Sequence, residues 1–533
     1  MTIRKKLLAV AITALFAGSA VAAPDDKRAD VEMLHETTLS LIQLLVEQGV
    51  LKQEAADALL KKAEQRAAEK TAQAKAAEAE AGKTETGKDV VRVVYVPEHV
   101  KREIREQVRQ EVVAQAKLER WGDVNAVPEW LDRLKWEGDI RLRYQDDLFA
   151  DGNAPETVFQ AIGQNIGNTL EDRQRERIRL RLALNANVTS NVDAGIRITT
   201  GNTSDPVSTN QTLGNTGNKY SLVLDRAFLK LRPTDGLTLW GGRIPNPFFS
   251  TDLVWDSDVN FEGAAVSYAP GSQELQREFK PFVTAGLFPL QEIEGKTGVA
   301  SKDKWLVAAQ AGLEWVPSTR ARFKLGAAYY QYKNVSGVRN LTPTTTGQYD
   351  LNSPQFRQKG NSLFVIDSDA NNNGNPNSEF DPVYGLAADY RIANLTLVAD
   401  FAEFFPVHVI GSFDWARNVG FDQAEILTRT GQNIQPETDG FQARLTVGYP
   451  KVSERHEWQA YVGYRHLERD AVLDAFTDSD FHLGGTNAKG FMIGGEYGIY
   501  KNTSVSARWM SSDEISGLPL SIDVFQLDLN AKF

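Results

Sequence analysis

Residues 177–184 read RIRLRLAL, and this alternation of arginine with isoleucine or leucine decides the fold. Successive side chains of an extended strand point to opposite faces, so Arg177, Arg179 and Arg181 share one face and the aliphatic residues share the other. Arginine cannot face lipid cheaply, whereas aliphatic side chains can. The stretch therefore predicts one strand of a membrane-spanning β-barrel, with arginines in a water-filled interior and aliphatic side chains against lipid.

The same period of two recurs after residue 134, for example in FQARLTVGY (441–449) and FMIGGEYGIY (491–500). Aromatic residues on the apolar faces, such as Trp458 and Tyr497, fit the girdles that flank the lipid-facing band of a barrel. A large soluble β-sandwich or propeller is the alternative, but it does not explain these girdles. The pattern predicts sixteen strands, near 135–145, 175–188, 192–202, 221–232, 236–244, 259–268, 280–288, 305–316, 321–334, 394–404, 407–418, 439–449, 456–469, 490–500, 503–512 and 523–533.

A further strand-like segment, 383–392, would make seventeen. Bacterial single-chain barrels have an even number of strands, with short periplasmic turns and longer outer loops. If Phe533 lies at the periplasmic end, the links can be assigned in turn by counting back along the chain. The short links then all fall on the periplasmic side and the long ones on the outer side only if 383–392 belongs to the large outer loop or extends the next strand. We therefore predict an all-β transmembrane barrel of about sixteen antiparallel strands over residues 135–533.

The chain begins with a predicted export signal. The basic residues of MTIRKK precede an apolar run, and Ala20–Ala22 ends this run as a small-x-small cleavage site. The run is too short for a membrane-spanning helix of about 20 residues, and no later stretch is long enough. Residues 1–22 are therefore expected to be removed during export, and the mature protein is expected in the cell outer membrane, in contact with its lipid.

Helical patterns precede the barrel. Residues 23–88 predict a helical hairpin and a spacer rich in Ala, Glu and Lys, and residues 89–134 predict a short β patch and a polar helix. The hairpin's apolar stripe is explained by packing on itself or a second copy, or by contact with the cell wall or another periplasmic partner. The polar helix favours a multi-chain coiled-coil stalk over a lone helix on the barrel rim, because apolar residues recur every four positions, at Val100, Ile104, Val108 and Val112. This whole region is expected in the periplasm.

Composition excludes several kinds of function. The net charge of −11 argues against nucleic acid as a partner. The chain has no cysteine, so disulfides and cysteine-based metal or nucleophilic sites are excluded. The six histidines are dispersed, and neither HExxH nor GxSxG occurs, so we expect no enzyme activity and no cofactor.

A calcium site in the longest outer loop is a weaker alternative. The segment DSDANNNGNPNSE (367–379) places Asp369, Asn371 and Asn373 at calcium-loop spacing. Pro376 interrupts that pattern, and an Asn/Gly turn explains the segment better.

Basic residues gather on the inward faces of the first strands: Arg141, Arg143, Arg177, Arg179, Arg181, Arg197, Arg226 and Lys230. Such an array repels itself unless water or carboxylates screen it. The link after the fifth strand carries Asp252, Asp256 and Asp258. Its position resembles that of the third outer loop of general porins, which folds into the lumen and sets acidic groups opposite a basic ladder. That resemblance implies a transverse field across a constriction; the alternative is a solvated surface loop above scattered lumen charges.

The last strand resembles the C-terminal signal by which the barrel-assembly machinery recognises outer-membrane proteins. One face of this strand carries its large apolar residues, Phe525, Leu527, Leu529 and Phe533. We therefore expect the assembly machinery to be a partner of the protein.

Several longer stretches resemble the putative porin family of proteobacterial outer-membrane proteins. They are LLVEQGVLKQEAADALL, VPEHVKREIREQVRQEV, WLDRLKWEGDIRLRY, GGRIPNPF and FPVHVIGSFDWARN, and together they span most of the mature chain. The resemblance implies a porin-like barrel with a helical periplasmic N-terminal part, and it implies no particular substrate.

From the residues and this resemblance, we expect passive diffusion of small hydrophilic solutes or ions through a water-filled pore. The arginine ladder would orient anions or dipolar solutes, and the three aspartates would balance it. One rival is a structural tether between the outer membrane and the cell wall through the N-terminal helices. Another is a substrate-specific anion or phosphate-type channel. General porins also imply a homotrimer.

Overall fold

The structure is a computed structural model that describes residues 131–533, apart from 272–276, 341–346 and 369–381. The predicted signal (1–22) and the predicted helices of 23–88 lie outside the described residues. So does all of 89–134 except its last residues, where a 3₁₀ turn at Leu131–Arg133 leads into the first strand. Within the described part of the chain, no helix is both long and apolar enough to cross a bilayer.

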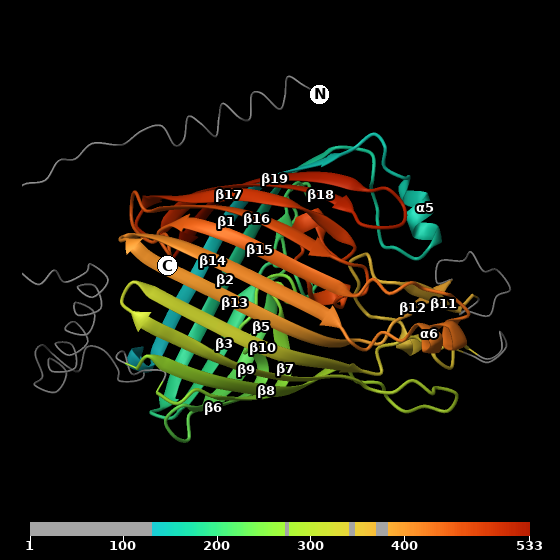
Figure 1. Ribbon diagram of the computed structural model, residues 1–533, viewed down its shortest axis with the longest axis horizontal. Helices are drawn as coiled ribbons and strands as arrows, with labels where there is room; N and C mark the ends of the chain where they lie inside the picture. Colours follow the sequence, from blue (N-terminus) through green and yellow to red (C-terminus); the bar gives the residue numbers. More distant parts are fainter. Residues whose placement is uncertain (1–130, 272–276, 341–346, 369–381) are drawn as a thin grey trace, which may run out of the picture. The chain divides into compact units, whose positions relative to one another are not determined.

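In the described residues, sixteen antiparallel strands close into a barrel, as predicted (Figure 1). Each strand pairs with its neighbour along the chain, and the first pairs with the last from Asp139 opposite Lys532 to Phe149 opposite Ile522. The two-residue β4 (Gln211–Thr212) pairs with β2 outside this ring order. The sixteen are β1 (Leu134–Phe149), β2 (Arg173–Thr189), β3 (Val192–Thr199), β5 (Val223–Leu231), β6 (Leu237–Pro245), β7 (Asn260–Tyr268), β8 (Phe279–Gln291), β9 (Lys304–Ser318), β10 (Ala321–Lys333), β13 (Arg391–Phe404), β14 (Val407–Asn418), β15 (Asp439–Gly448), β16 (Trp458–Leu467), β17 (Ala488–Tyr500), β18 (Thr503–Glu514) and β19 (Ser521–Lys532).

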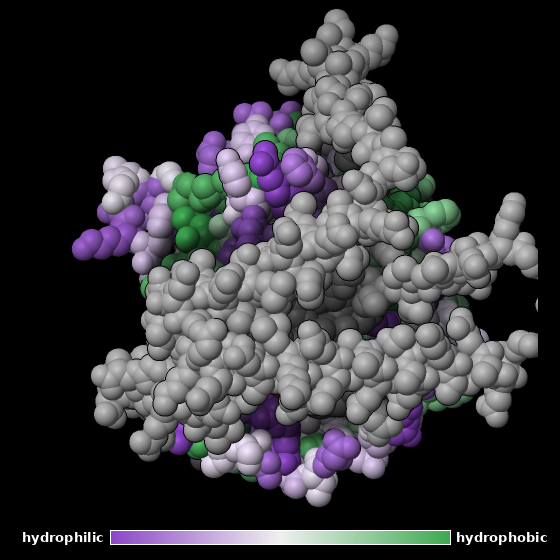
Figure 2. Space-filling model, turned by 90° about the vertical axis from the view of Figure 1, so that its left-hand side faces the viewer, coloured by the Kyte–Doolittle hydropathy of each residue, from purple (hydrophilic) through white to green (hydrophobic). Residues whose placement is uncertain are grey.

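Segment 383–392 forms no seventeenth strand of the barrel, as predicted. Its first part forms β12 (Val383–Leu386), which pairs with β11 (Leu363–Asp367) in a separate two-stranded sheet. Its last two residues begin β13. This small sheet lies in the long loop, at the same end of the barrel as helices α5 (Glu156–Ala161) and α6 (Gln423–Thr430) (Figure 1). The short turns and the C-terminus lie at the opposite end, where Figure 2 shows hydrophilic residues along much of the rim.

The outer face of the barrel is apolar and open. Val283 and Ile493 are each 51% exposed, although both are aliphatic residues in the middle of strands. Contiguous exposed aliphatic surface is costly in water and is typical of a lipid-facing band. The alternation of the sequence therefore does place its apolar face outward.

Much of the buried apolar core lies inside the barrel, on one side. The loop between β6 and β7, residues 246–259, folds inward and packs on the inner face of β7 to β10. Phe248 and Trp255 of this loop make edge contacts with Tyr330, at ring-centre distances of 5.4 and 5.2 Å. Aromatic packing of this kind anchors the loop on one wall of the barrel.

Candidate functional site

The predicted basic residues of β1 and β2 lie on the inner face of the barrel. Arg179 and Arg181 both donate to Asp139 of β1, with N···O distances of 2.7 Å. Arg143 makes a two-point ion pair with Asp528 of β19, at 2.7 and 2.9 Å. Because these carboxylates stand on the same inner face, the wall neutralises much of its own basic ladder.

Arg141 and Arg177 are less well balanced. Arg141 Nη2 donates to Asn210 Oδ1 at 2.5 Å, and it reaches the carboxylate of Asp528 only at 4.0 Å. Arg177 donates to Ser208 Oγ at 3.5 Å and has no carboxylate within 4.0 Å among the described residues. Neutral polar groups thus cover the ladder at these two positions.

A β-bulge on β5 adds a carboxylate that simple alternation hides. Arg197 lies opposite Arg226, but the next pair of the register skips Asp225. Both neighbours therefore turn inward, and Arg197 forms an ion pair with Asp225. Lys230, further along the same strand, lies over the ring of Trp240, with its Nζ 4.7 Å from the ring centre.

Only one of the three predicted loop aspartates contacts the predicted ladder. Asp258 pairs with Arg181 at 2.9 Å. Asp252 instead pairs with Arg444 of β15 and Arg465 of β16, each at 3.2 Å. The prediction did not foresee this second set of arginines, because the loop crosses to strands that are far away in the sequence.

Asp256 has no cation within 4.0 Å in the described part of the chain. Its carboxylate accepts the backbone N–H groups of Asp258 and Ser479, at 2.8 and 2.9 Å. Burial raises the pKa of Asp256 well above its ordinary value, and the nearby carboxylates of Asp478 and Asp258 raise it further. The expectation that all three aspartates balance the ladder is therefore corrected: Asp256 links two loops instead.

The loop between β16 and β17 also enters the barrel, a path that the sequence pattern did not predict. Its Asp480 pairs with Arg143 at 2.9 Å and with Arg508 of β18 at 2.5 Å. Its Asp478 pairs with Arg465 at 3.0 Å. This loop therefore supplies carboxylates to both sets of arginines.

The two inward loops share a short sequence. Loop 246–259 and loop 468–487 both carry Asp-Ser-Asp, at 256–258 and 478–480. In each copy the first aspartate accepts the backbone N–H of the second, at 2.8 and 3.1 Å. The tripeptide forms the same tight turn in both loops, but it also occurs at 367–369, so it does not by itself indicate an inward loop.

These groups form a charged belt on one side of the barrel interior, from β1, β2, β15, β16, β18 and β19 and from the two inward loops. We define the belt as nine arginines and seven aspartates joined by ion pairs or shared polar side chains, which leaves an excess of two positive charges: Arg141, Arg143, Arg175, Arg177, Arg179, Arg181, Arg444, Arg465, Arg508, Asp139, Asp147, Asp252, Asp258, Asp478, Asp480 and Asp528.

The arginines keep the key loop carboxylates ionised. Burial by itself raises the pKa of Asp252, but Arg444 and Arg465 outweigh burial and hold this pKa below its ordinary value. The two arginine partners of Asp480 hold its pKa well below the ordinary value in the same way, against burial. Both carboxylates are therefore charged at neutral pH and contribute to the field of the belt.

A buried lysine fixes loop 468–487 to the long loop between β10 and β13. Lys359 Nζ donates to the backbone carbonyls of His482 and Gly484, the latter at 2.5 Å. Burial lowers the pKa of Lys359 to about 8. Because two carbonyl oxygens depend on this ammonium, the outer loops form one connected structure above the belt.

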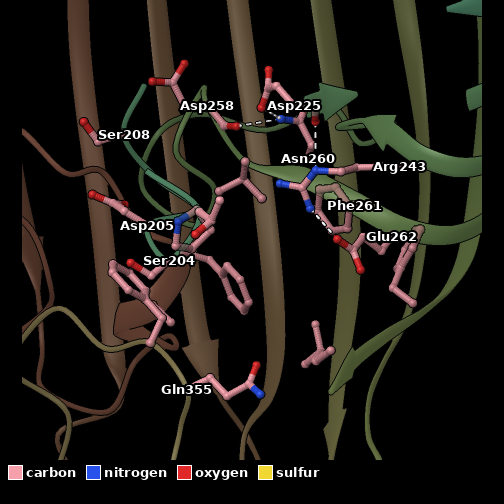
Figure 3. Close-up of a pocket in the computed structure, with 18 of the residues that line it drawn as sticks. Ser204, Asp205, Ser208, Asp225, Arg243, Asp258, Asn260, Phe261, Glu262 and Gln355 are labelled. Atoms are coloured by element: carbon pink, nitrogen blue, oxygen red, sulfur yellow. Dashed lines mark hydrogen bonds and ion pairs between the residues drawn. The ribbon is translucent and has the colours of Figure 1, made fainter. Parts of the chain in front are cut away.

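An outer vestibule of about 1060 Å³ lies between these loops and the outer ends of β5 to β9 (Figure 3). Asp205 and Ser208 line one side of it, and Arg243 and Glu262 line another (Figure 3). Ser208 also contacts Arg177, as described above, so the vestibule adjoins the belt.

The calcium candidates Asp369, Asn371 and Asn373 lie outside the described residues. Among the described residues, no group of three or more His, Asp and Glu side chains is arranged to hold a metal ion. On β19, Leu527 and Leu529 are 42% and 41% exposed on the outer face, as expected of the C-terminal strand. Phe525 lies 6.4 Å from Trp509, measured between ring centres, and Phe533 is 64% exposed. Recognition by the assembly machinery stays a prediction.

Comparison with solved structures finds outer-membrane proteins of low sequence identity. Similar solved structures include OprB of Pseudomonas putida, with a TM-score of 0.42, 12% identity and coverage of 76% of this chain and 96% of that chain. The outer-membrane channel DcaP of Acinetobacter baumannii has a TM-score of 0.39 and 12% identity, and OmpF of Salmonella typhi has a TM-score of 0.38 and 11% identity. Each match covers 75% of this chain and 97% of the other chain. No curated protein sequence matches this chain.

A family match covers most of the sequence. Residues 35–533 match the family described as Putative porin, so the match includes the barrel and much of the region before it. The chain therefore belongs to the Putative porin family and is an outer-membrane porin, with its charged belt inside a closed barrel of sixteen strands.

Proposed function

We propose that the charged belt is the selectivity region of a water-filled diffusion pore for small hydrophilic solutes, with a modest preference for anions. The observation that carries this proposal is the excess of two positive charges in the belt. A positive excess within a low-dielectric ring attracts anions and repels cations. The proposed activity is transport without catalysis.

Conductance in a planar bilayer tests the proposal. The full-length protein is inserted at low salt, and the reversal potential is measured across a tenfold KCl gradient. We expect discrete open-channel steps and a reversal potential whose sign is that of the chloride equilibrium potential. Folded protein that gives no open-channel current would refute the pore, and a potential on the potassium side would refute the anion preference.

A substrate-specific oxyanion channel is a narrower form of the same proposal. Arg141 and Arg177 support it, since neutral groups rather than close carboxylates cover them. Saturation of the current and block of chloride current by inorganic phosphate distinguish this form from general diffusion. A linear current without block favours general diffusion.

We also propose a homotrimer. The outer face of β5 to β7 is apolar: Leu229 and Val266 are 53% and 40% exposed. A second copy of the chain that packs on this face buries apolar surface. Chemical crosslinking in outer-membrane vesicles should give a trimer band, and a band at monomer size alone would contradict the proposal.

A tether to the cell wall is a second candidate function. The family match begins at residue 35, so sequence ahead of the barrel belongs to the family pattern. We expect residues 23–120, fused to a carrier protein, to co-sediment with purified cell-wall sacculi. The carrier alone is the control, and equal sedimentation of both would remove the tether. Contact with the cell wall and formation of a pore are compatible in one molecule.

A further inference from the structure

Most ionisable side chains that line the outer vestibule already have a partner of opposite charge. These pairs neutralise one another and leave no charge available for a solute. The pairs are Asp225 with Arg197, Asp258 with Arg181, and Glu262 with Arg243.

Two acids that line the vestibule have no such partner, Asp474 and Asp205. Asp474 is only 3% exposed, so Asp205 is the acid that a solute can reach. It belongs to the loop between β3 and β5, and its Oδ1 accepts the backbone N–H of Val207 at 3.0 Å. In the described chain no cation lies within 4.0 Å of its carboxylate, and the side chain faces the vestibule (Figure 3). Burial raises the pKa of Asp205 by more than the backbone N–H of Val207 and the more distant Arg177 lower it.

Lys304 is the corresponding base. It begins β9, is 5% exposed and lines the same vestibule. Its Nζ donates to the backbone carbonyl of Ser353 at 2.7 Å, and no carboxylate within 4.0 Å accompanies it in the described residues. A buried charge without a counter-charge is costly, so such a group is either destabilising or matched by something that binds beside it.

We propose that the outer vestibule binds zwitterionic solutes, namely amino acids and short peptides, with the solute ammonium at Asp205 and the solute carboxylate at Lys304. A single solute that carries both charges satisfies both unpaired groups at once. A solute with one charge satisfies only one of them and leaves the other unpaired.

The size and the remaining lining of the vestibule agree with this class of solute. Its volume of about 1060 Å³ is at the upper end of small-molecule pockets, which suits a short peptide better than a single ion. Leu290, Phe356 and Phe476 also line it and are partly buried, so apolar side chains of a peptide have surfaces to contact. This inference rests on the proposed pore, because it describes binding at the pore's outer entrance.

Four tripeptide probes of nearly equal size test the charge requirement. They are triglycine, N-acetyl-triglycine, triglycine amide and N-acetyl-triglycine amide, which are zwitterion, anion, cation and neutral molecule at pH 7. The full-length protein is inserted into planar bilayers, and the reduction of the KCl current is titrated with each probe. We expect triglycine to reach half-saturation at a concentration at least about tenfold lower than any other probe, because each charged hydrogen bond is worth about that factor.

Substitutions then locate the binding site. Lys304→Gln should remove the advantage of triglycine over the cation, and Asp205→Asn should remove its advantage over the anion. Lys304→Arg keeps the charge and should keep the preference, which separates a binding role from a folding role. The matched controls Lys219→Gln and Asp151→Asn alter exposed charges and should change nothing.

The outcomes separate this inference from the proposed function. If all four probes block the open channel equally, the zwitterion site is overturned and the pore is kept. The same holds if Lys304→Gln and Asp205→Asn leave the preference for triglycine unchanged. Absence of open-channel current from the folded wild-type protein overturns the pore itself.

Discussion

The substitution Asp480→Asn tests the electrostatics of the pore most directly. Asp480 comes from a loop, and its two oxygens lie 2.9 Å from Arg143 Nη1 and 2.5 Å from Arg508 Nη2. Its amide analogue has nearly the same shape and keeps the ability to accept from Gln526, which donates to Oδ1 at 2.9 Å. The substitution therefore removes one negative charge from the belt with little change in side-chain shape, and the amide NH₂ that replaces Oδ2 no longer accepts from Arg508.

The size of the effect follows from Coulomb's law. One unit charge about 7 Å from a passing ion contributes roughly 0.6 kcal/mol in water. Loss of Asp480 lowers the energy of an anion and raises that of a cation by this amount, so the anion-to-cation permeability ratio rises roughly sevenfold at low salt. Screening reduces the change to roughly threefold at 0.1 M salt, where the Debye length is about 10 Å.

The assay is the reversal potential in asymmetric KCl, measured at two salt concentrations. Asp235→Asn, in an exposed turn between β5 and β6, removes the same charge away from the belt and serves as the control. The reasoning is refuted if the variant folds and conducts but its permeability ratio stays at the wild-type value, or if the ratio shifts toward cations.

Three further substitutions test the loops and the barrel closure. Trp255→Ala removes an edge contact with Tyr330, at 5.2 Å between ring centres, and about 3–5 kcal/mol of packing energy. Because this packing holds loop 246–259 on the barrel wall, single-channel recordings should show larger and noisier currents. Unchanged currents would contradict this prediction. Gly138→Val places a side chain about where the ring of Phe533 lies, because a Cβ at this position would be 2.5 Å from that ring. The variant should unfold at a lower temperature in a heat-modifiability gel. An unchanged unfolding temperature would show that the pairing of β1 with β19 tolerates the substitution. Burial raises the pKa of Asp474 from 3.8 to about 7, so the folded state holds a proton that the unfolded state releases and stability falls as pH rises between these values. Asp474→Asn should flatten that fall in thermal unfolding at pH 4 to 8, and an identical pH profile would oppose the assignment.

The charged lining could be predicted in part. Arg177, Arg179 and Arg181 alternate with aliphatic residues, and their inward direction follows from that pattern alone. Arg444 also stands on the polar face of a predicted strand, in FQARLTVGY. Its pairing with Asp252 was not predictable, because no local rule specifies which wall an inward loop crosses to.

The bulge on β5 shows where strict alternation fails. Asp225 and Arg226 are adjacent in the sequence, so a regular strand would send one of them to lipid. One extra residue in the register turns both inward, and Arg197 then pairs with Asp225. A bulge is stabilised by its partner strand and its ion pair, and neither is visible in the strand's own sequence.

The sequence by itself determined the number of strands, their parity and the face that each presents to lipid. These are local properties, because a period of two and a short turn are both encoded within a few consecutive residues. Only the tertiary structure decided that two Asp-Ser-Asp loops enter the lumen, which arginine each aspartate meets, and that Asp205 and Lys304 face one vestibule without partners. These features depend on contacts between segments far apart in the chain, and a loop's path through a barrel is set by the walls it meets there.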